Sequence, residues 1–333
     1  MRDIKAMLRP WPRVISLIAA VIPVAVLAFI VVNLVLESIP AIRNVGLGEM
    51  LFSTEFCGRL QAGRGLYGLV PALWGTFLAV VIAISLALPV SLAMAVFSSE
   101  FPLGFLGRGM RGILGLLSGI PPIVYAIGSG VLVRLFMIPN FAGGFPRWGV
   151  DVATELGLPL GYLGAARSVP WGWPFGNSTL LGGMVLALLI IPFVAPLIHD
   201  AIENVPHGLK EASLALGANR WHTLIRVTLP LALSGIIAAT ALGALKAMGD
   251  VMIAGWVIGW APRIMPVPLW DVLEASQPLT STGAGLVGLE NPQSSGTEFS
   301  VANFTGLLLL VMAFAIMGLT TLLQRKFWKR FSS

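Results

Sequence analysis

The sequence is poor in charge and almost free of cysteine. Only 11% of its 333 residues are charged and 56% are hydrophobic, whereas about 25% of the residues in an ordinary soluble domain are charged. So few charged side chains cannot cover a water-facing surface, which excludes an ordinary soluble globular protein. The single cysteine, Cys57, excludes an internal disulfide, and with only three histidines it also excludes a zinc cluster of Cys/His type.

The sequence also lacks the motifs of an enzyme. No segment reads G-x-x-x-x-G-K-[ST], and no hydrophilic stretch is long enough for a nucleotide-binding domain. His199, Asp200 and His207 are close in the sequence, but their spacing fits neither a zinc site nor a nucleophile with its base, so we expect a solvated face there. We therefore predict no catalytic residue, no metal site and no cofactor in this chain.

The chain instead carries six apolar segments, each long enough to cross a hydrocarbon core of about 30 Å. They lie at 14–36, 69–97, 113–138, 180–198, 229–258 and 304–323. We predict an all-α membrane protein with six transmembrane helices. It would comprise a cytoplasmic segment (1–13), a first transmembrane helix (14–36), an external loop (37–68), a core domain of five transmembrane helices (69–323) and a basic cytoplasmic tail (324–333).

The basic residues indicate how these helices are oriented. With both termini in the cytoplasm, basic residues on the inner side outnumber those in the external loops by about two to one, which agrees with the positive-inside rule. The inner set is Arg2, Lys5, Arg9, Arg13, Arg108, Arg111, Lys210, Arg220, Arg226, Arg325, Lys326, Lys329 and Arg330, and the outer set is Arg43, Arg59, Arg64, Arg147, Arg167 and Arg263. Because these residues flank apolar segments, the net charge of +6 indicates membrane orientation and no nucleic-acid partner.

Proline, glycine and hydroxyl residues predict interruptions of the helices. Gly119, Pro121 and Pro122 are expected to kink or break the third helix, and Pro192 and Pro196 the fourth. The stretch 277–300 is dominated by Gly, Ser, Thr and Pro and has no periodic apolar pattern, so we predict a mobile external loop there.

The most strongly patterned polar stretch is 203–230, which reads ENVPHGLKEASLALGANRWHTLIRVTLP and follows the fourth apolar segment. Gly217 suits a helix C-cap and Asn219 a helix N-cap, so the pattern predicts two short helices joined by a sharp turn. Three apolar residues fall on one face of the second helix: Trp221, Leu224 and Ile225. Amphipathic helices too short to span must lay their apolar side on membrane helices or in a groove of another protein, which predicts a docking surface.

This stretch resembles the EAA loop of ABC importer permeases. The residues at the positions of the family pattern are Glu211, Ala212, Ser213, Gly217, Val227, Thr228, Leu229 and Pro230. Six of them match the pattern, and Ser213 and Val227 are conservative departures from it. The resemblance implies the type I ABC importer permease fold, in which this loop is the coupling helix seated in a cleft of an ATPase subunit that binds ATP and magnesium. It assigns ATPase coupling to Glu211, Ala212, Ser213, Gly217, Arg220, Leu229 and Pro230.

Four further segments, 68–77, 88–101, 118–128 and 244–259, look like phosphate-importer permeases of the PstC type. This resemblance implies import of inorganic phosphate across a bacterial inner membrane, with a PstA-type second permease, a PstB-type ATPase dimer and a PstS-type periplasmic phosphate-binding protein. A homodimer of permeases satisfies the same two-fold geometry, and phosphonate, sulfate or molybdate is an alternative substrate. Proton-coupled secondary transport is a further alternative, against which the lack of an inverted repeat argues.

The sequence departs from this family in the fifth apolar segment. The family usually places Arg and Glu four residues apart, followed by Thr, where this chain has Lys246, Asp250 and Val251. Charges deep in a membrane segment are costly, so we expect Lys246 and Asp250 to face the bundle interior or an aqueous path and to pair at i, i+4. They are the candidate residues of the translocation pathway. The alternative is a structural ion pair that only fixes helix register.

Overall fold

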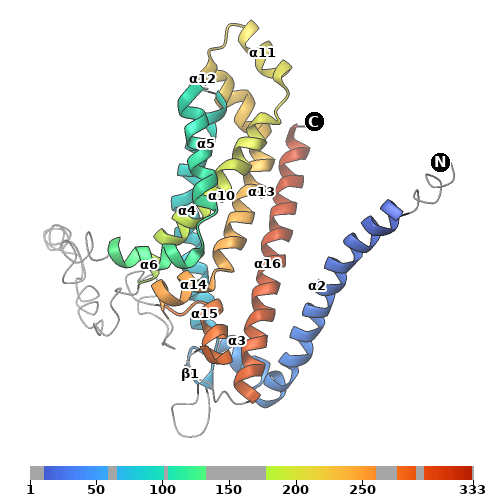
Figure 1. Cartoon of the computed structure of the whole chain (residues 1–333), viewed down its shortest axis with the longest axis vertical. Coiled ribbons are helices and arrows are strands. Elements are labelled where there is room, and N and C mark those ends of the chain that lie inside the picture. Colours follow the sequence, from blue (N-terminus) through green and yellow to red (C-terminus); the bar gives the residue numbers. More distant parts are fainter. Residues whose placement is uncertain are drawn as a thin grey trace, which may run out of the picture.

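The structure is a computed structural model that describes residues 11–58, 66–100, 104–132, 178–259, 276–289 and 296–331. Within these ranges the regular elements are helices and one two-stranded antiparallel sheet (Figure 1). The helices are α2 (Trp11–Asn44), α3 (Leu47–Phe52), α4 (Val70–Glu100), α5 (Gly104–Ser118), α6 (Pro122–Leu132), α10 (Thr179–Glu203), α11 (His207–Ala215), α12 (Arg220–Thr223), α13 (Leu229–Met248), α14 (Val251–Ile253), α15 (Leu279–Ala284) and α16 (Gly296–Phe331). Three π-helical turns, η3 (Leu224–Thr228), η4 (Ala254–Ile258) and η5 (Gly285–Leu289), continue α12, α14 and α15, and strand β1 (Phe56–Gly58) pairs with β2 (Leu66–Tyr67).

Five described helices are long and apolar enough to span a membrane: α2, α4, α10, the run from α12 through α13, and α16. A sixth span results if the pair Gly112–Ser118 and Pro122–Ser129, which meets at 90°, counts as one. This bend confirms the predicted break at the prolines, where Tyr125 Oη donates to the carbonyl of Leu117 at 2.9 Å. Helix α10, by contrast, continues through its two prolines without a break. The end of the predicted third segment, 133–138, lies outside the described residues.

The packed core lies between α4, α10 and α13, where small residues allow the helices to approach closely. Ala83 and Ala87 of α4 are buried in the same cluster as Ile190 and Val194 of α10. At Gly243 of α13, an added Cβ atom would lie 2.6 Å from Cγ2 of Val194. Small residues at such contacts are the usual basis of helix association in membranes, since lipid and core side chains are equally apolar.

Helix α2 stands outside this core. In the most apolar 18-residue stretch of this helix, which lies within the described residues, 0% of the residues are buried. It packs against α16 and leans away from the bundle toward its N-terminal end (Figure 1). Apolar side chains without protein neighbours suit a helix that faces lipid, because the bilayer takes up apolar surface.

A second apolar cluster closes one end of the bundle, opposite to α11 and α12 (Figure 1). It consists of Ala41, Met50, Phe56, Tyr67, Leu69, Val301 and Phe304. Helix α2 extends to Asn44, beyond the predicted boundary at residue 36, and α3 and the strands β1 and β2 follow it. The segment predicted as an external loop, 37–68, therefore contains regular structure that packs against α16.

The prediction of a loop at 277–300 is wrong for the residues that the structure describes there. Residues 279–284 form α15, in which Leu279 and Ser281 are fully buried, and α16 already begins at Gly296. The hydroxyls of Ser281 and Thr282 each donate to the carbonyl of Pro278 at 2.9 Å. Because these side chains satisfy local backbone groups, a stretch rich in Ser and Thr can be buried.

Candidate functional site

The polar stretch 203–230 forms a helical hairpin at the end of the bundle toward which the C-terminal end of α16 also points (Figure 1). Helix α11 ends in a turn at Gly217, whose φ is +88°. The N–H groups of Gly217 and Ala218 donate to the carbonyls of Leu214 and Ser213 at 3.0 and 3.2 Å, the pattern of a Schellman C-cap. Asn219 Oδ1 then accepts from the N–H of His222 at 2.7 Å and caps α12. Both predicted caps are confirmed.

The hairpin exposes an unusual amount of apolar surface. None of the residues of α11, all of which are described, is buried. The three apolar residues predicted to share a face of the second helix differ in burial: Leu224 of η3 is buried, whereas Trp221 of α12 and Ile225 of η3 are 60% and 47% exposed. Together with Leu209, Leu214 and Leu216, these two exposed residues form an apolar surface around the turn, which we call the docking surface.

The residues assigned to ATPase coupling fall into two groups. Glu211, Ala212, Gly217 and Arg220 are exposed on the hairpin, whereas Leu229 and Pro230 are half-buried at the start of α13. Ser213 lies between the groups, and its Oγ is 3.0 Å from Thr223 Oγ1, a contact that joins α11 to α12. No described atom of this chain lies within 4 Å of an added Gly217 Cβ. Within this chain, Gly217 is therefore required by its backbone conformation and not by a close neighbour.

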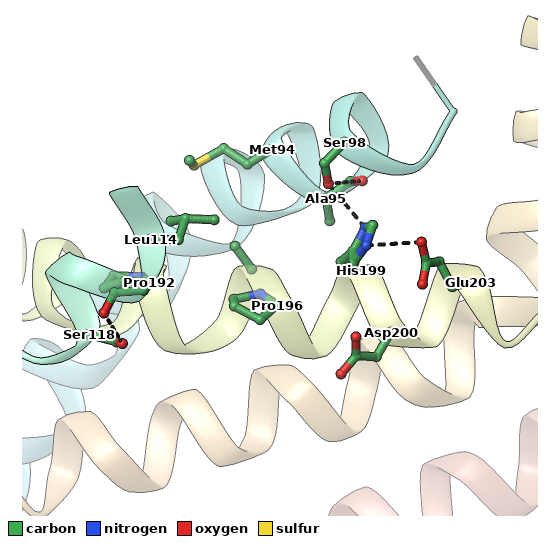
Figure 2. A pocket seen from close by; sticks show the side chains of 12 residues that line it. Met94, Ala95, Ser98, Leu114, Ser118, Pro192, Pro196, His199, Asp200 and Glu203 are labelled. Atoms are coloured by element: carbon green, nitrogen blue, oxygen red, sulfur yellow. Dashed lines mark hydrogen bonds and ion pairs between the residues drawn. The ribbon is translucent and has the colours of Figure 1, made fainter. Parts of the chain in front are cut away.

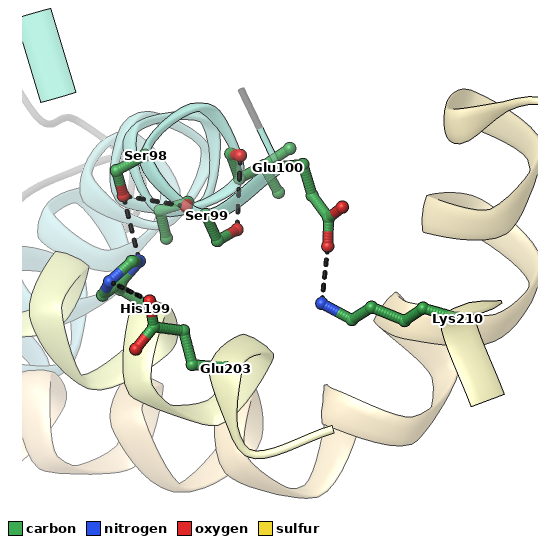
Figure 3. A network of polar contacts seen from close by, with 8 residues as sticks. Ser98, Ser99, Glu100, His199, Glu203 and Lys210 are labelled. Atoms are coloured by element: carbon green, nitrogen blue, oxygen red, sulfur yellow. Dashed lines mark hydrogen bonds and ion pairs between the residues drawn. The ribbon is translucent and has the colours of Figure 1, made fainter. Parts of the chain in front are cut away.

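His199 departs from the prediction of a solvated face. The residue is 8% exposed; its Nδ1 lies 3.0 Å from Ser98 Oγ of α4, and its Nε2 lies 3.1 Å from Glu203 Oε1 (Figure 3). Asp200 and His207 are exposed, as expected. Among the described residues, no group of three or more His, Cys, Asp or Glu is placed to hold a metal ion.

A second polar contact joins the same end of α4 to α11. Lys210 Nζ donates to Glu100 Oε1 at 2.8 Å, and the two side chains are only 15% and 16% exposed (Figure 3). The sequence analysis did not single out this pair, because its partners are 110 positions apart. The one available signal was an acidic residue at the end of an apolar segment.

Two cavities open among the described helices. The first, of about 360 Å³, lies between α4, α5 and α10 (Figure 2) and is lined by Met94, Ser98, Leu114, Ser118, Pro192, Pro196, His199, Asp200 and Glu203, among others. The second, of about 570 Å³, lies between α4, α13 and α16 and is almost wholly apolar. The residues that line these two cavities do not include Lys246 or Asp250.

The predicted i, i+4 pairing of Lys246 and Asp250 is wrong. Helix α13 ends at Met248, and Asp250 Oδ1 caps the next helix by accepting from the N–H of Ile253 at 2.7 Å. Lys246 Nζ lies instead over the ring of Phe193 in α10, 4.6 Å from the ring centroid. Among the described residues, the ion pairs within 4.0 Å are His199–Glu203 and Lys210–Glu100. Within the described part of the chain, therefore, the recorded contact of the Lys246 ammonium is the ring of Phe193, with no carboxylate oxygen within 4.0 Å.

Comparisons with known sequences agree with this architecture. A family model described as "Binding-protein-dependent transport system inner membrane component" matches residues 87–329. The chain is 30% identical over 310 residues to the phosphate transport system permease protein PstC 1 of Mycobacterium tuberculosis, covering 89% of this chain and 86% of that protein. It is 29% identical over 301 residues to the PstC protein of Haemophilus influenzae, covering 90% of this chain and 88% of that protein.

Solved structures show the same fold. A chain of a bacterial ABC transporter involved in the import of the acidic polysaccharide alginate matches with a TM-score of 0.54 at 16% identity, over 98% of this chain and 99% of that chain. A chain of the MetNI methionine ABC transporter in an inward-facing conformation matches with a TM-score of 0.53 at 18% identity, over 78% of this chain and 95% of that chain. The predicted permease fold is confirmed.

Proposed function

This chain belongs to the family of binding-protein-dependent transport system inner membrane components, and from that premise we propose that it passes inorganic phosphate across a bacterial inner membrane. As an ABC transporter permease it is a multi-pass membrane component and not itself catalytic. Permeases of this class pair with an ATPase and a binding protein. Membership of the family favours ATP-driven import over the proton-coupled alternative.

Phosphate is proposed as the substrate because the chain is similar to PstC proteins. The similarity extends over about nine tenths of this chain in the proteins from M. tuberculosis and H. influenzae. The expected partners are therefore a PstA-type permease, a PstB-type ATPase dimer, which would bind ATP and magnesium, and a PstS-type binding protein. The departure at Lys246 and Asp250 leaves phosphonate, sulfate and molybdate as the substrates to test against phosphate.

The docking surface is proposed to seat in the ATPase. An exposed apolar patch that includes Leu216, which is 90% exposed, is costly in water and marks an interaction site. Glu211 and Arg220 add exposed charges beside it, which can select the partner. We also propose that both termini lie in the cytoplasm, and this is supported by α2 beginning and α16 ending toward the hairpin's end of the bundle (Figure 1).

Lys246 is proposed as an anion contact in the pathway. The face of an aromatic ring attracts a cation without neutralising it, so Phe193 can hold the ammonium while leaving its charge available to a passing anion. Asp250 remains the second proposed pathway residue. Its carboxylate caps α14, and its carbonyl accepts from Thr280 Oγ1 at 3.5 Å, so it supports the backbone beside the lysine.

The experiment is reconstitution of this permease with its ATPase, second permease and binding protein in proteoliposomes, followed by measurement of anion-stimulated ATP hydrolysis. Phosphate should stimulate hydrolysis, and Glu211→Ala should weaken that stimulation. Stimulation by sulfate, molybdate or a phosphonate in place of phosphate would contradict the substrate while leaving the importer mechanism intact. Absence of stimulation by any of these anions would contradict the coupled mechanism.

A further inference from the structure

Helix α11 has little packing to hold it in place. The structure describes all of its residues, and none of them is buried. The elements it packs against, α12 and η3, belong to the same hairpin. One side-chain contact, between Ser213 and Thr223, stays within the hairpin. The other, between Lys210 and Glu100, reaches a membrane helix (Figure 3). Among the described side chains, the Lys210–Glu100 contact is therefore the polar link that ties α11 to a membrane helix outside the hairpin.

The two charges of this contact stand at the unfavourable ends of their own helices. Glu100 is the last residue of α4 as described, where the helix dipole disfavours a negative charge. Lys210 is in the first turn of α11, where the dipole disfavours a positive charge. Neither residue therefore stabilises the helix that carries it. The placement is explained by the link between the two helices.

The last turn of α4 is also fixed from its other side. Ser98 Oγ lies 3.0 Å from Nδ1 of His199, which belongs to the last full turns of α10 (Figure 3). Glu100 is thus carried by a helix end that is itself anchored to α10. A displacement of α11 that pulls on Glu100 must reach α4 and α10 together.

We propose that the Glu100–Lys210 pair transmits the movement of α11 to α4, which makes both residues positioning residues for ATP-coupled transport. The inference rests on the proposed docking of α11 on an ATPase. Helices α4 and α10 form the most extensive helix contact of the described chain. Helix α10 also carries Phe193, whose ring lies under Lys246. The pair therefore begins a continuous chain of contacts from the docking surface to the proposed anion contact.

The test is a charge-reversal experiment in the reconstituted complex. Glu100→Gln and Lys210→Met each remove one charge, and Glu100→Lys combined with Lys210→Glu restores an opposite pair. We expect each single variant to lower anion-stimulated ATP hydrolysis about fivefold while unstimulated hydrolysis stays within about twofold of wild type. The reversed pair should recover stimulation to within about twofold of wild type.

The controls separate coupling from stability. Glu100→Gln removes a charge that the dipole of α4 disfavours and keeps a side-chain oxygen that can accept from Lys210, so the thermal midpoint of the complex should fall little. Lys210→Arg keeps the charge and should keep stimulation. Arg226→Met removes a second positive charge of the hairpin, one that is exposed, so it is the control and should leave stimulation unchanged.

Two results would overturn the inference. If an anion stimulates the wild-type complex and the single variants keep full stimulation, the Glu100–Lys210 pair does not couple α11 to α4. Single variants that lose stimulation or assembly without recovery in the reversed pair would show that the effect does not come from the pair. Recovery of assembly or stimulation by the reversed pair supports it. A wild-type complex that no anion stimulates contradicts the proposed function and, with it, this inference.

Discussion

The core of α4, α10 and α13 and the hairpin of α11 and α12 are held in place by different means. In the core, Ala83 and Ile190 are fully buried and glycines admit neighbouring side chains. In α11 no residue of the described helix is buried, and two polar side-chain contacts join it to Glu100 of α4 and Thr223 of α12. Close packing fixes one arrangement because any shift opens voids, whereas a helix without buried residues loses little packing when it shifts. The hairpin is suited to move and the core to respond as a unit.

The largest effect should follow from overfilling the core. Gly243→Val would drive a side chain into Val194, so we expect the free energy of unfolding to fall by about 2 kcal/mol or more. Thermal denaturation of the purified protein measures this change. The control is Gly318→Val in α16, where an added Cβ meets no described atom within 4 Å. Equal losses in both variants would contradict the contrast between packed and open positions.

A smaller and purely functional effect is expected from the charge in the core. Lys246→Ala should lower anion uptake about tenfold, the loss expected for a charge-assisted contact, while the thermal midpoint stays near that of wild type. Lys246→Arg should keep most of the uptake. Radiolabelled phosphate uptake into proteoliposomes provides the measurement. Normal uptake by Lys246→Ala combined with Asp250→Ala would show that both residues are only structural.

The docking surface should show binding effects without stability effects. Trp221→Ala removes a large exposed aromatic residue, so affinity for the ATPase should fall about tenfold, as for an interface hot spot. The free energy of unfolding should change by no more than about 0.5 kcal/mol. Titration of the purified ATPase measures the affinity. Leu319→Ala, which removes an equally exposed apolar residue from α16, should leave it unchanged.

The smallest effect is expected within α11 itself. Gly208→Ala adds a Cβ atom that meets no described atom within 4 Å, and alanine favours helix, so α11 should gain about 0.5 kcal/mol of local stability. Hydrogen exchange at the amides of α11 should slow by about twofold, while exchange in α4 and α10 stays unchanged. Slower exchange in the core as well would mean that hairpin and core are one cooperative unit.

Local patterns were sufficient to predict the hairpin and the bend between α5 and α6. Gly217, Asn219 and the prolines act through backbone groups within a few residues, so their effects can be read from neighbouring positions. The exposure of Trp221 and Ile225 could not be predicted in this way. It depends on which side of α12 and η3 packs against the rest of the protein, where Thr223, Leu224 and Thr228 are buried.

The pathway and the buried hydroxyl-rich segment show where local reasoning failed. Spacing of four residues predicted a pair between Lys246 and Asp250, but the helix ends between them and the carboxylate caps the next helix. Composition predicted a loop at 277–300, but Thr76 Oγ1 accepts from the N–H of Leu279 at 2.9 Å across the bundle. The cap at Asp250 spans three residues and is itself local, whereas the burial of residues 279–284 involves Thr76, a neighbour that the sequence does not place.

By itself, the sequence determined that this protein is a helical membrane protein with a short helical hairpin between two of its apolar segments, because apolar length, charge distribution and capping residues act along the chain. The tertiary structure alone decided that Lys210 meets Glu100, that His199 is buried against Ser98, and that Lys246 lies over Phe193. These contacts join residues that lie far apart in the sequence, and they exist only because α4, α10 and α13 pack in one particular arrangement.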